Sequence, residues 1–140
     1  MPIVITNRTT QSVFGPVDTA GPNASANIPE VYFTNVYDTA TPEFLAEFSK
    51  QLVDTACYFA KSRPVYMVRP IPEMPGNVSI AMTRAMVWGQ QNEVSISLAQ
   101  YHQRHAFVWA AQDNARKRCG IKILDPLPYL CADGRCHGTK

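Results

Sequence analysis

The chain ends with the stretch Ile121-Lys122-Ile123-Leu124-Asp125-Pro126-Leu127-Pro128-Tyr129-Leu130-Cys131-Ala132-Asp133-Gly134-Arg135-Cys136-His137-Gly138-Thr139-Lys140. The short apolar run Ile121–Leu124 stops at Asp125-Pro126, and such a run bounded by turn residues is typical of a buried strand. Two cysteines, Cys131 and Cys136, then flank a turn that contains Asp133-Gly134. This stretch therefore predicts the end of a parallel strand followed by a small loop that a disulfide could close.

The segment before this strand carries the clearest helix signals in the chain. Ser97 and Gln100 fit a capping box, in which each side chain binds a backbone N–H that the helix leaves free. Basic residues crowd the last turn before Gly120, which is typical of a helix C-terminus. These signals predict a helix over 97–119.

A second helix is predicted further upstream, over 42–62. Thr41-Pro42 is a favourable start, because threonine caps the helix and proline suits its first position. Apolar residues then recur at helical spacing up to the residues before Pro64. The short runs Ile3–Thr6 and Val65–Val68 are apolar and read as buried strands.

Two segments are less regular. The segment Thr9–Ala40 is rich in Thr, Asn, Gly and Pro, which predicts a long surface loop containing at most a short extended piece at Val31–Phe33. The segment Ile80–Val87 mixes apolar and polar residues and is compatible with a short helix, although its pattern does not decide this.

The order strand, helix, strand, helix, strand predicts an α/β fold around a three-stranded parallel sheet, with helices on one face or both. Ligands in such sheets bind at the carboxyl ends of the strands. Those ends are Thr6-Asn7-Arg8, Arg69-Pro70 and Asp125-Pro126, so we expect any site to be found there.

The composition narrows the class of protein. A chain of 140 residues with 46% hydrophobic residues is expected to form one domain with its own core. The net charge of +2 is too small to indicate a nucleic-acid partner. No apolar run approaches the roughly 18 residues of a membrane span, and no signal-peptide pattern is visible at the N-terminus.

The four cysteines carry different expectations. Cys131 and Cys136 are expected to pair in an oxidising compartment, and the alternative is two free thiols in a cytosolic loop. Cys57 and Cys119 fall on the apolar faces of the two predicted helices, so we expect them to be buried structural thiols.

Several stretches together resemble one known family. They are Pro2–Arg8, Val65–Glu73, Tyr101 with Arg104, and Ile123–Pro126 with Leu130, Cys131 and Cys136. In their order and spacing they resemble the SGNH (GDSL-like) esterase domain that is fused to bacterial membrane O-acyltransferases. The resemblance implies a flavodoxin-like, SGNH-hydrolase-like parallel sheet. It also implies that residues 1–140 are a single partial domain, internal to a larger one.

This resemblance implies a function in the acylation of cell-surface polysaccharide. The expected setting is the periplasmic face of the bacterial inner membrane, within a larger integral membrane protein that modifies surface or lipopolysaccharide glycans. The expected partners are an acyl donor from the membrane domain and a glycan acceptor, and neither a cofactor nor a metal is expected. Because the chain has no Gly-Asp-Ser and no Asp-x-x-His motif, we expect no catalytic Ser or His in it and no activity in isolation. The missing neighbour strand leaves a sheet edge that could self-associate.

The resemblance also places candidate site residues. Asn7 and Arg8 occupy the slot where the family positions an oxyanion-hole side chain, although a polar loop start is the alternative. Arg69 is a weaker substrate-binding candidate, because an arginine at a strand end is more often a structural ion-pair partner. Asp125 is expected to cap a turn.

The remaining chemistry-bearing residues point to packing more than to a site. His102 and His105 lie three apart on a helix, and His137 follows Cys136, but no further ligand completes a zinc set. Of the two tryptophans, Trp88 is better placed for sugar contact than Trp109. Two other functions stay open: a non-catalytic α/β domain that recognises a glycan or a partner protein, and a small metal- or redox-responsive domain.

Overall fold

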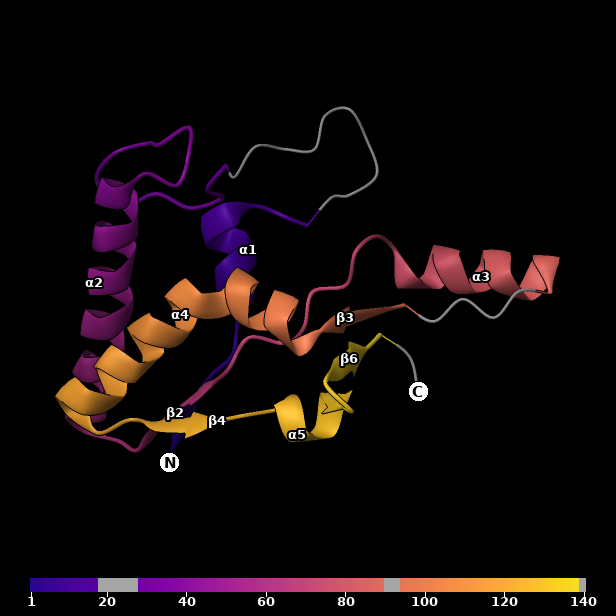
Figure 1. The fold of residues 1–140 in the computed structure, drawn as a ribbon. Coiled ribbons are helices and arrows are strands. Elements are labelled where there is room, and N and C mark those ends of the chain that lie inside the picture. Colours follow the sequence, from indigo (N-terminus) through magenta and orange to yellow (C-terminus); the bar gives the residue numbers. More distant parts are fainter. Residues whose placement is uncertain (18–27, 90–93, 139–140) are drawn as a thin grey trace.

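A parallel sheet forms the centre of the computed structural model, which describes residues 1–17, 28–89 and 94–138. Its strand order is β1-β2-β4 (Figure 1). The strands are β1 (Ile3–Ile5), β2 (Val65–Val68) and β4 (Lys122–Leu124). Both pairings are parallel, as predicted from the sequence. The strand β1 ends one residue earlier than predicted, and β4 begins one residue later.

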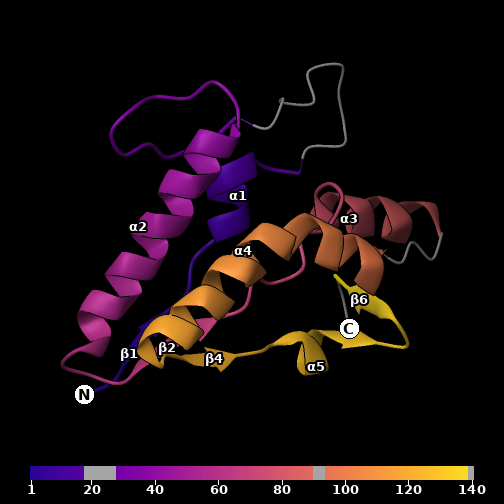
Figure 2. The ribbon, with the colours of Figure 1, turned by 60° about the vertical axis from the view of Figure 1, so that its left-hand side comes forward.

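Two long helices, α2 (Pro42–Ala60) and α4 (Leu98–Cys119), lie side by side on one face of this sheet (Figure 2). Thr41 caps α2 by accepting a hydrogen bond from the Phe44 amide. The capping box of α4 is present with Ser97 as the N-cap, and Gly120 ends the helix in the left-handed conformation. Both helices were predicted from these local signals.

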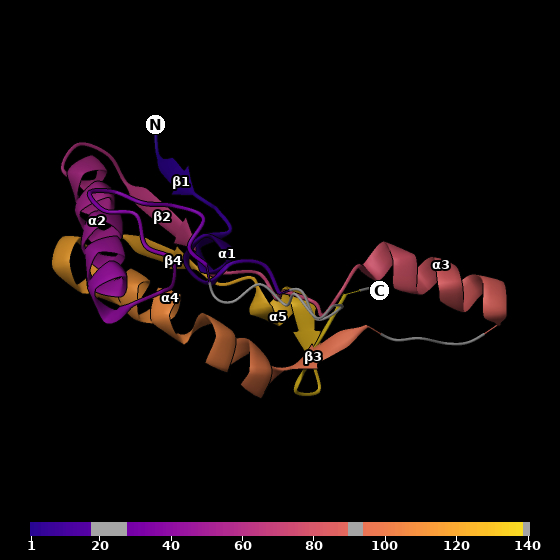
Figure 3. The ribbon, with the colours of Figure 1, turned by 90° about the horizontal axis from the view of Figure 1, so that it is seen from above.

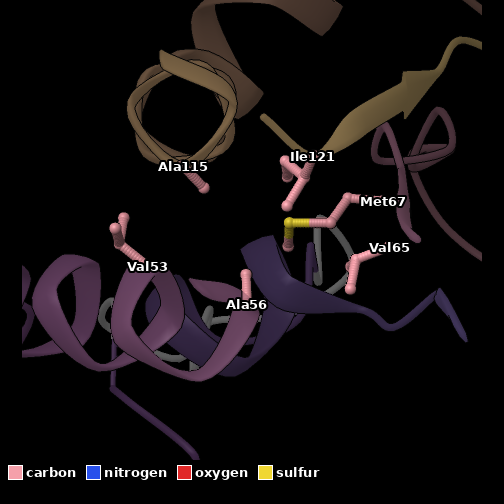
Figure 4. Packing of buried hydrophobic residues seen from close by; sticks show 6 residues of the cluster. All are labelled: Val53, Ala56, Val65, Met67, Ala115 and Ile121. Carbon is pink, nitrogen blue, oxygen red and sulfur yellow. The ribbon is translucent and has the colours of Figure 1, made fainter. Parts of the chain in front are cut away.

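The main core lies between the sheet and the two helices (Figure 4). Its buried members come from α2, β2, α4 and the residue just before β4: Val53, Ala56, Val65, Met67, Ala115 and Ile121. Strand residues alternate between the two faces of a sheet, so Val4 and Leu124 point away from this core and are 56% and 43% exposed. Neither long helix covers that second face.

The sequence predicted a loop over Thr9–Ala40, but the first residues of that segment form the helix α1 (Thr9–Phe14). Thr9, Thr10 and Val13 are buried, and Val13 packs against Phe44 of α2. Threonine, serine and valine are weak helix formers, so the helix depends on tertiary burial that no local pattern reveals. Val31–Phe33, where a short extended piece was expected, belongs to no paired strand among the described residues.

The segment Ile80–Val87, which the sequence left undecided, belongs to the helix α3 (Val78–Trp88). Asn77 caps its start by accepting a hydrogen bond from the Ile80 amide, and Gly89 ends it in the left-handed conformation. It extends away from the body of the molecule (Figures 1 and 3). Only Ala85 is buried among its residues.

A small antiparallel sheet, which the sequence did not predict, follows the main one. Its order is β3-β6-β5, with strands Ser95–Ser97, Arg135–His137 and Cys131–Ala132. The short helix α5 (Leu127–Leu130) leads into it. The hairpin turn Asp133-Gly134 has positive φ at both residues, as a type I′ turn requires. Strands this short carry no detectable alternation.

Two disulfides cross-link the chain. Cys131 and Cys136 face each other in the β5–β6 hairpin and are bonded, as the sequence indicated. The prediction of buried free thiols at Cys57 and Cys119 is wrong, because these two residues form the second disulfide. Each cysteine looks like an ordinary apolar position on its own helix, and only the packing of α2 against α4 brings the sulfur atoms together.

Candidate active site cavity

A cavity of about 340 Å³ opens at the carboxyl ends of β1 and β2. One wall comes from Asn7, Arg8 and the first turn of α1. The opposite wall comes from residues 70–74, which follow β2, and from Val78 at the start of α3. This volume is at the lower end of the range for small-molecule sites. Of the sequence candidates, the structure brings Asn7 and Arg8 to this cavity.

Asn7 and Arg8 are exposed side chains held on the turn between β1 and α1. The Oδ1 atom of Asn7 accepts a hydrogen bond from the hydroxyl of Thr9. An amide whose oxygen is engaged in this way can present its two N–H donors to a ligand. Arg8 is the N-cap residue of α1 without a capping side-chain bond, and its guanidinium carries a fixed positive charge at the cavity.

Side chains of α4 form hydrogen bonds to the segments on both sides of the cavity. The Tyr101 hydroxyl donates to the carbonyl oxygen of Pro70 at 2.6 Å. Arg104 pairs with Glu73 at 3.0 Å and donates from Nη2 to the carbonyl oxygen of Gly15 at 2.6 Å. Since Glu73 and Gly15 follow β2 and α1 respectively, this one arginine links the two sides of the site.

His105 contacts a further residue that lines the cavity. It is 1% exposed, and its Nδ1 atom lies 2.6 Å from the hydroxyl oxygen of Thr10, which lines the cavity. Its Nε2 atom is buried and finds no hydrogen-bond partner among the described residues. Burial, helped by the nearby charge of Arg104, lowers the pKa of His105 from 6.5 to about 4. The imidazole is therefore neutral at neutral pH.

Arg69 does not line this cavity. It is 5% exposed and stacks over the ring of Trp109, with 3.9 Å from Cζ to the ring centroid. Its guanidinium bonds Asp113 at 2.6 Å and Gln112 at 3.1 Å. This is the structural ion pair that the sequence favoured over substrate binding for Arg69, and it joins the end of β2 to α4.

The other candidates also have structural partners. The Oδ1 atom of Asp125 accepts from the Leu127 amide and so caps the turn into α5, as expected. Trp109 packs on Arg69 and donates from Nε1 to the Tyr101 hydroxyl. In the part of the chain that the structure describes, no three His, Cys, Asp or Glu residues cluster as a metal site.

One family model matches residues 2–140, that of the SGNH domain fused to AT3 domains. The chain belongs to this SGNH family. The resemblance drawn from its motifs is thus confirmed, as is the α/β fold. No curated protein and no solved structure matched the chain in the same comparisons.

Fusion to AT3 membrane domains implies that the SGNH domain is part of a membrane protein. Over residues 1–17, 28–89 and 94–138, none of its helices has the length and apolar character needed to span a bilayer. The cavity of this SGNH domain lies where the family's parallel sheet directs ligands, at the strand ends.

Sequence reasoning missed how Thr10 and His105 meet in this SGNH domain. Thr10 fell within the predicted loop, and His105 was assigned to packing or solvation. One signal was available, because Tyr101, Arg104 and His105 have the i, i+3, i+4 spacing of a single helix face. Their partners lie 31 to 95 residues away along the chain, so the spacing alone could not identify them.

Proposed function

We propose that this SGNH domain takes part in transferring an acyl group, most simply acetyl, to a cell-surface polysaccharide. The proposed setting is the periplasmic face of the bacterial inner membrane. There the membrane domain of the parent protein supplies the acyl donor and a glycan hydroxyl accepts the group. The observation that carries the proposal is the cavity at the carboxyl ends of β1 and β2, with Asn7 and Arg8 on its wall.

The chemistry of acyl transfer explains the roles that we assign. Attack on an ester carbonyl places negative charge on its oxygen, and preorganised donors lower the barrier by binding that oxyanion. We assign the Asn7 amide to this task, and Arg8 to binding the oxyanion or the substrate beside it. A nucleophile and its base are also required. The sequence contains neither a Gly-Asp-Ser nor an Asp-x-x-His motif.

The first test measures hydrolysis of p-nitrophenyl acetate by the 140-residue chain. We expect no rate above background, because nucleophile and base act as a unit and residual catalysis without them is small. A robust rate from this chain alone would show that the active site has been misplaced.

The second test uses the parent protein with all of its segments. Asn7→Ala and Arg8→Ala are each expected to lower kcat by about 10²-fold, the effect of losing one oxyanion donor. The matched controls are Asn114→Ala and Arg63→Ala, which change exposed residues of the same types away from the cavity. Unchanged kcat in both site variants would show that Asn7 and Arg8 have no role in the reaction and only form the start of the loop. Lost glycan binding with unchanged hydrolysis would favour a recognition role.

A further inference from the structure

The far end of α3 exposes three consecutive apolar side chains. Met86, Val87 and Trp88 are 87%, 75% and 74% exposed. They end a helix that extends away from the rest of the molecule (Figure 3). Two further apolar residues of the same helix, Ile80 and Met82, are about half exposed. A soluble surface helix normally shows solvent a polar face, so this apolar end is expected to have an occupant.

The arrangement of these side chains indicates what kind of occupant fits. A protein groove takes one stripe of a helix, spaced i, i+3, i+4 and i+7. Consecutive residues on a helix point about 100° apart, so Met86, Val87 and Trp88 point in three directions around the helix end. A fluid apolar medium can surround all three at once, whereas one groove cannot.

The charge and the residue types agree with a lipid surface. The helix Val78–Trp88 contains one charged residue, Arg84, and no acidic residue. A cation beside an apolar end suits anionic headgroups. Tryptophan is enriched at the level of the headgroups, where its amphipathic ring is accommodated. Fusion to AT3 membrane domains implies a membrane protein and so keeps a bilayer within reach.

We propose that the end of α3, formed by Met86, Val87 and Trp88, inserts to the boundary between the headgroups and the acyl chains of an anionic phospholipid bilayer, with Arg84 at the headgroups. This anchor orients the domain on the membrane. It does not depend on the proposed acyl transfer, because it uses no residue of the cavity wall formed by Asn7 and Arg8.

Vesicle flotation of the 140-residue chain tests the proposal. The chain should float with vesicles of mixed phosphatidylethanolamine and phosphatidylglycerol, and more weakly with pure phosphatidylcholine. The bound fraction should fall when salt is raised from about 0.1 M to about 1 M, because the Debye length shrinks from about 10 Å to about 3 Å. Tryptophan emission should shift to shorter wavelength on binding. This shift reports Trp88, since the other tryptophan, Trp109, is already packed on Arg69.

Variants distinguish insertion of the α3 end from nonspecific adsorption of the chain to vesicles. The triple variant Met86→Ser, Val87→Ser, Trp88→Ser should weaken the vesicle partition constant at least about tenfold, because three apolar side chains no longer leave water. Trp88→Phe should keep flotation and lose the emission shift. Tyr58→Ser removes an apolar side chain of similar exposure (69%) on α2 and should change nothing. Arg84→Gln should remove much of the salt dependence, whereas Arg63→Gln should not.

The result that overturns the proposal is equal flotation of the original chain and the triple variant, or no flotation of either. A dimer that the original chain forms and the triple variant does not would assign the helix end to a second copy of the chain. That result would also overturn the proposal. In the parent protein in native membranes, a photo-crosslinking amino acid in place of Trp88 should give lipid adducts. Adducts to the parent protein alone would show that its own chain covers the end of α3.

Discussion

His105 lies against Thr10 and Tyr101 in the interior, where its neutral form is strongly favoured. Its Nδ1 atom lies within hydrogen-bond distance of Thr10, and its ring packs 4.5 Å from that of Tyr101, centroid to centroid. Burial comes first among the causes that lower its pKa, and Arg104 and His102 add to it. A buried imidazolium beside the charge of Arg104 would cost free energy.

This residue makes the stability of the domain depend on pH. The pKa of His105 is 6.5 in the unfolded chain and about 4 in the native state, so the unfolded state binds more protons between these values. The contribution is fully present above about pH 6.5 and is lost as pH falls toward 4. We expect a loss of up to about 3 kcal/mol in the free energy of unfolding from this group. Urea unfolding at a series of pH values measures it.

The control compares two histidines on the same helix. His105→Gln should flatten the dependence on pH between 6.5 and 4, whereas His102→Gln, which changes an exposed ring, should retain most of it. An identical pH dependence in His105→Gln and in the original chain would show that His105 does not titrate as described.

At the scale of elements, α2 and α4 are joined by more than packing. The disulfide Cys57–Cys119 links the last turns of the two helices and closes a separation of 62 residues. The disulfide Cys131–Cys136 closes a separation of 5 residues within one hairpin. Because loop-closure entropy grows with loop length, the first bond constrains the unfolded chain far more than the second.

We therefore expect unequal losses of stability when each disulfide is removed. Replacing Cys57 and Cys119 by alanine should lower the free energy of unfolding by about 4 kcal/mol. The same change at Cys131 and Cys136 should lower it by about 2 kcal/mol. Denaturant unfolding of oxidised protein measures both. Equal losses would contradict the loop-length argument.

Thiol titration provides an independent check on the disulfides. Under denaturing, non-reducing conditions the oxidised chain should show no free thiol, because all four cysteines are paired. Two reactive thiols that peptide mapping assigns to Cys57 and Cys119 would return these residues to the state that the sequence suggested. Four would contradict both bonds, and bound zinc would favour the metal-responsive alternative.

At the scale of the whole molecule, the parallel sheet is covered on one face by α2 and α4 and ends at β1 and β4. In the described residues β1 pairs with β2 alone, so it has an open edge beside the exposed Val4. An unpaired strand edge next to apolar surface is a template for pairing with another chain. We expect the 140-residue chain to self-associate through this edge as its concentration rises.

Light scattering coupled to size-exclusion chromatography measures this association. Val4→Lys should shift the population toward monomer, since a charge beside an open edge disfavours strand pairing. Tyr32→Lys, which changes an exposed residue outside the sheet, serves as the control. A monomer at all concentrations would contradict the expectation, and dissociation by the control as well would assign the contact to another surface.

Local signals in the sequence sufficed for the elements whose ends and faces are set by near neighbours. The capping residues of α2 and α4, the apolar runs of β1, β2 and β4, and their alternating order determined a parallel α/β sheet and the positions of its strand ends. The motifs also sufficed to recognise the SGNH family. Each of these inferences depends on residues a few positions apart, where helix period, capping and turn chemistry act directly.

Only the tertiary structure decided which distant residues meet. It folded Thr9–Phe14 into a helix, paired Cys57 with Cys119, set Thr10 against His105 and enclosed Arg69 between Trp109 and Asp113. The identity of each residue permits more than one partner: a cysteine on an apolar helix face fits a core as well as a disulfide. The choice is made by burial when α2 and α4 pack on the same face of the sheet, and burial is a property of the whole fold.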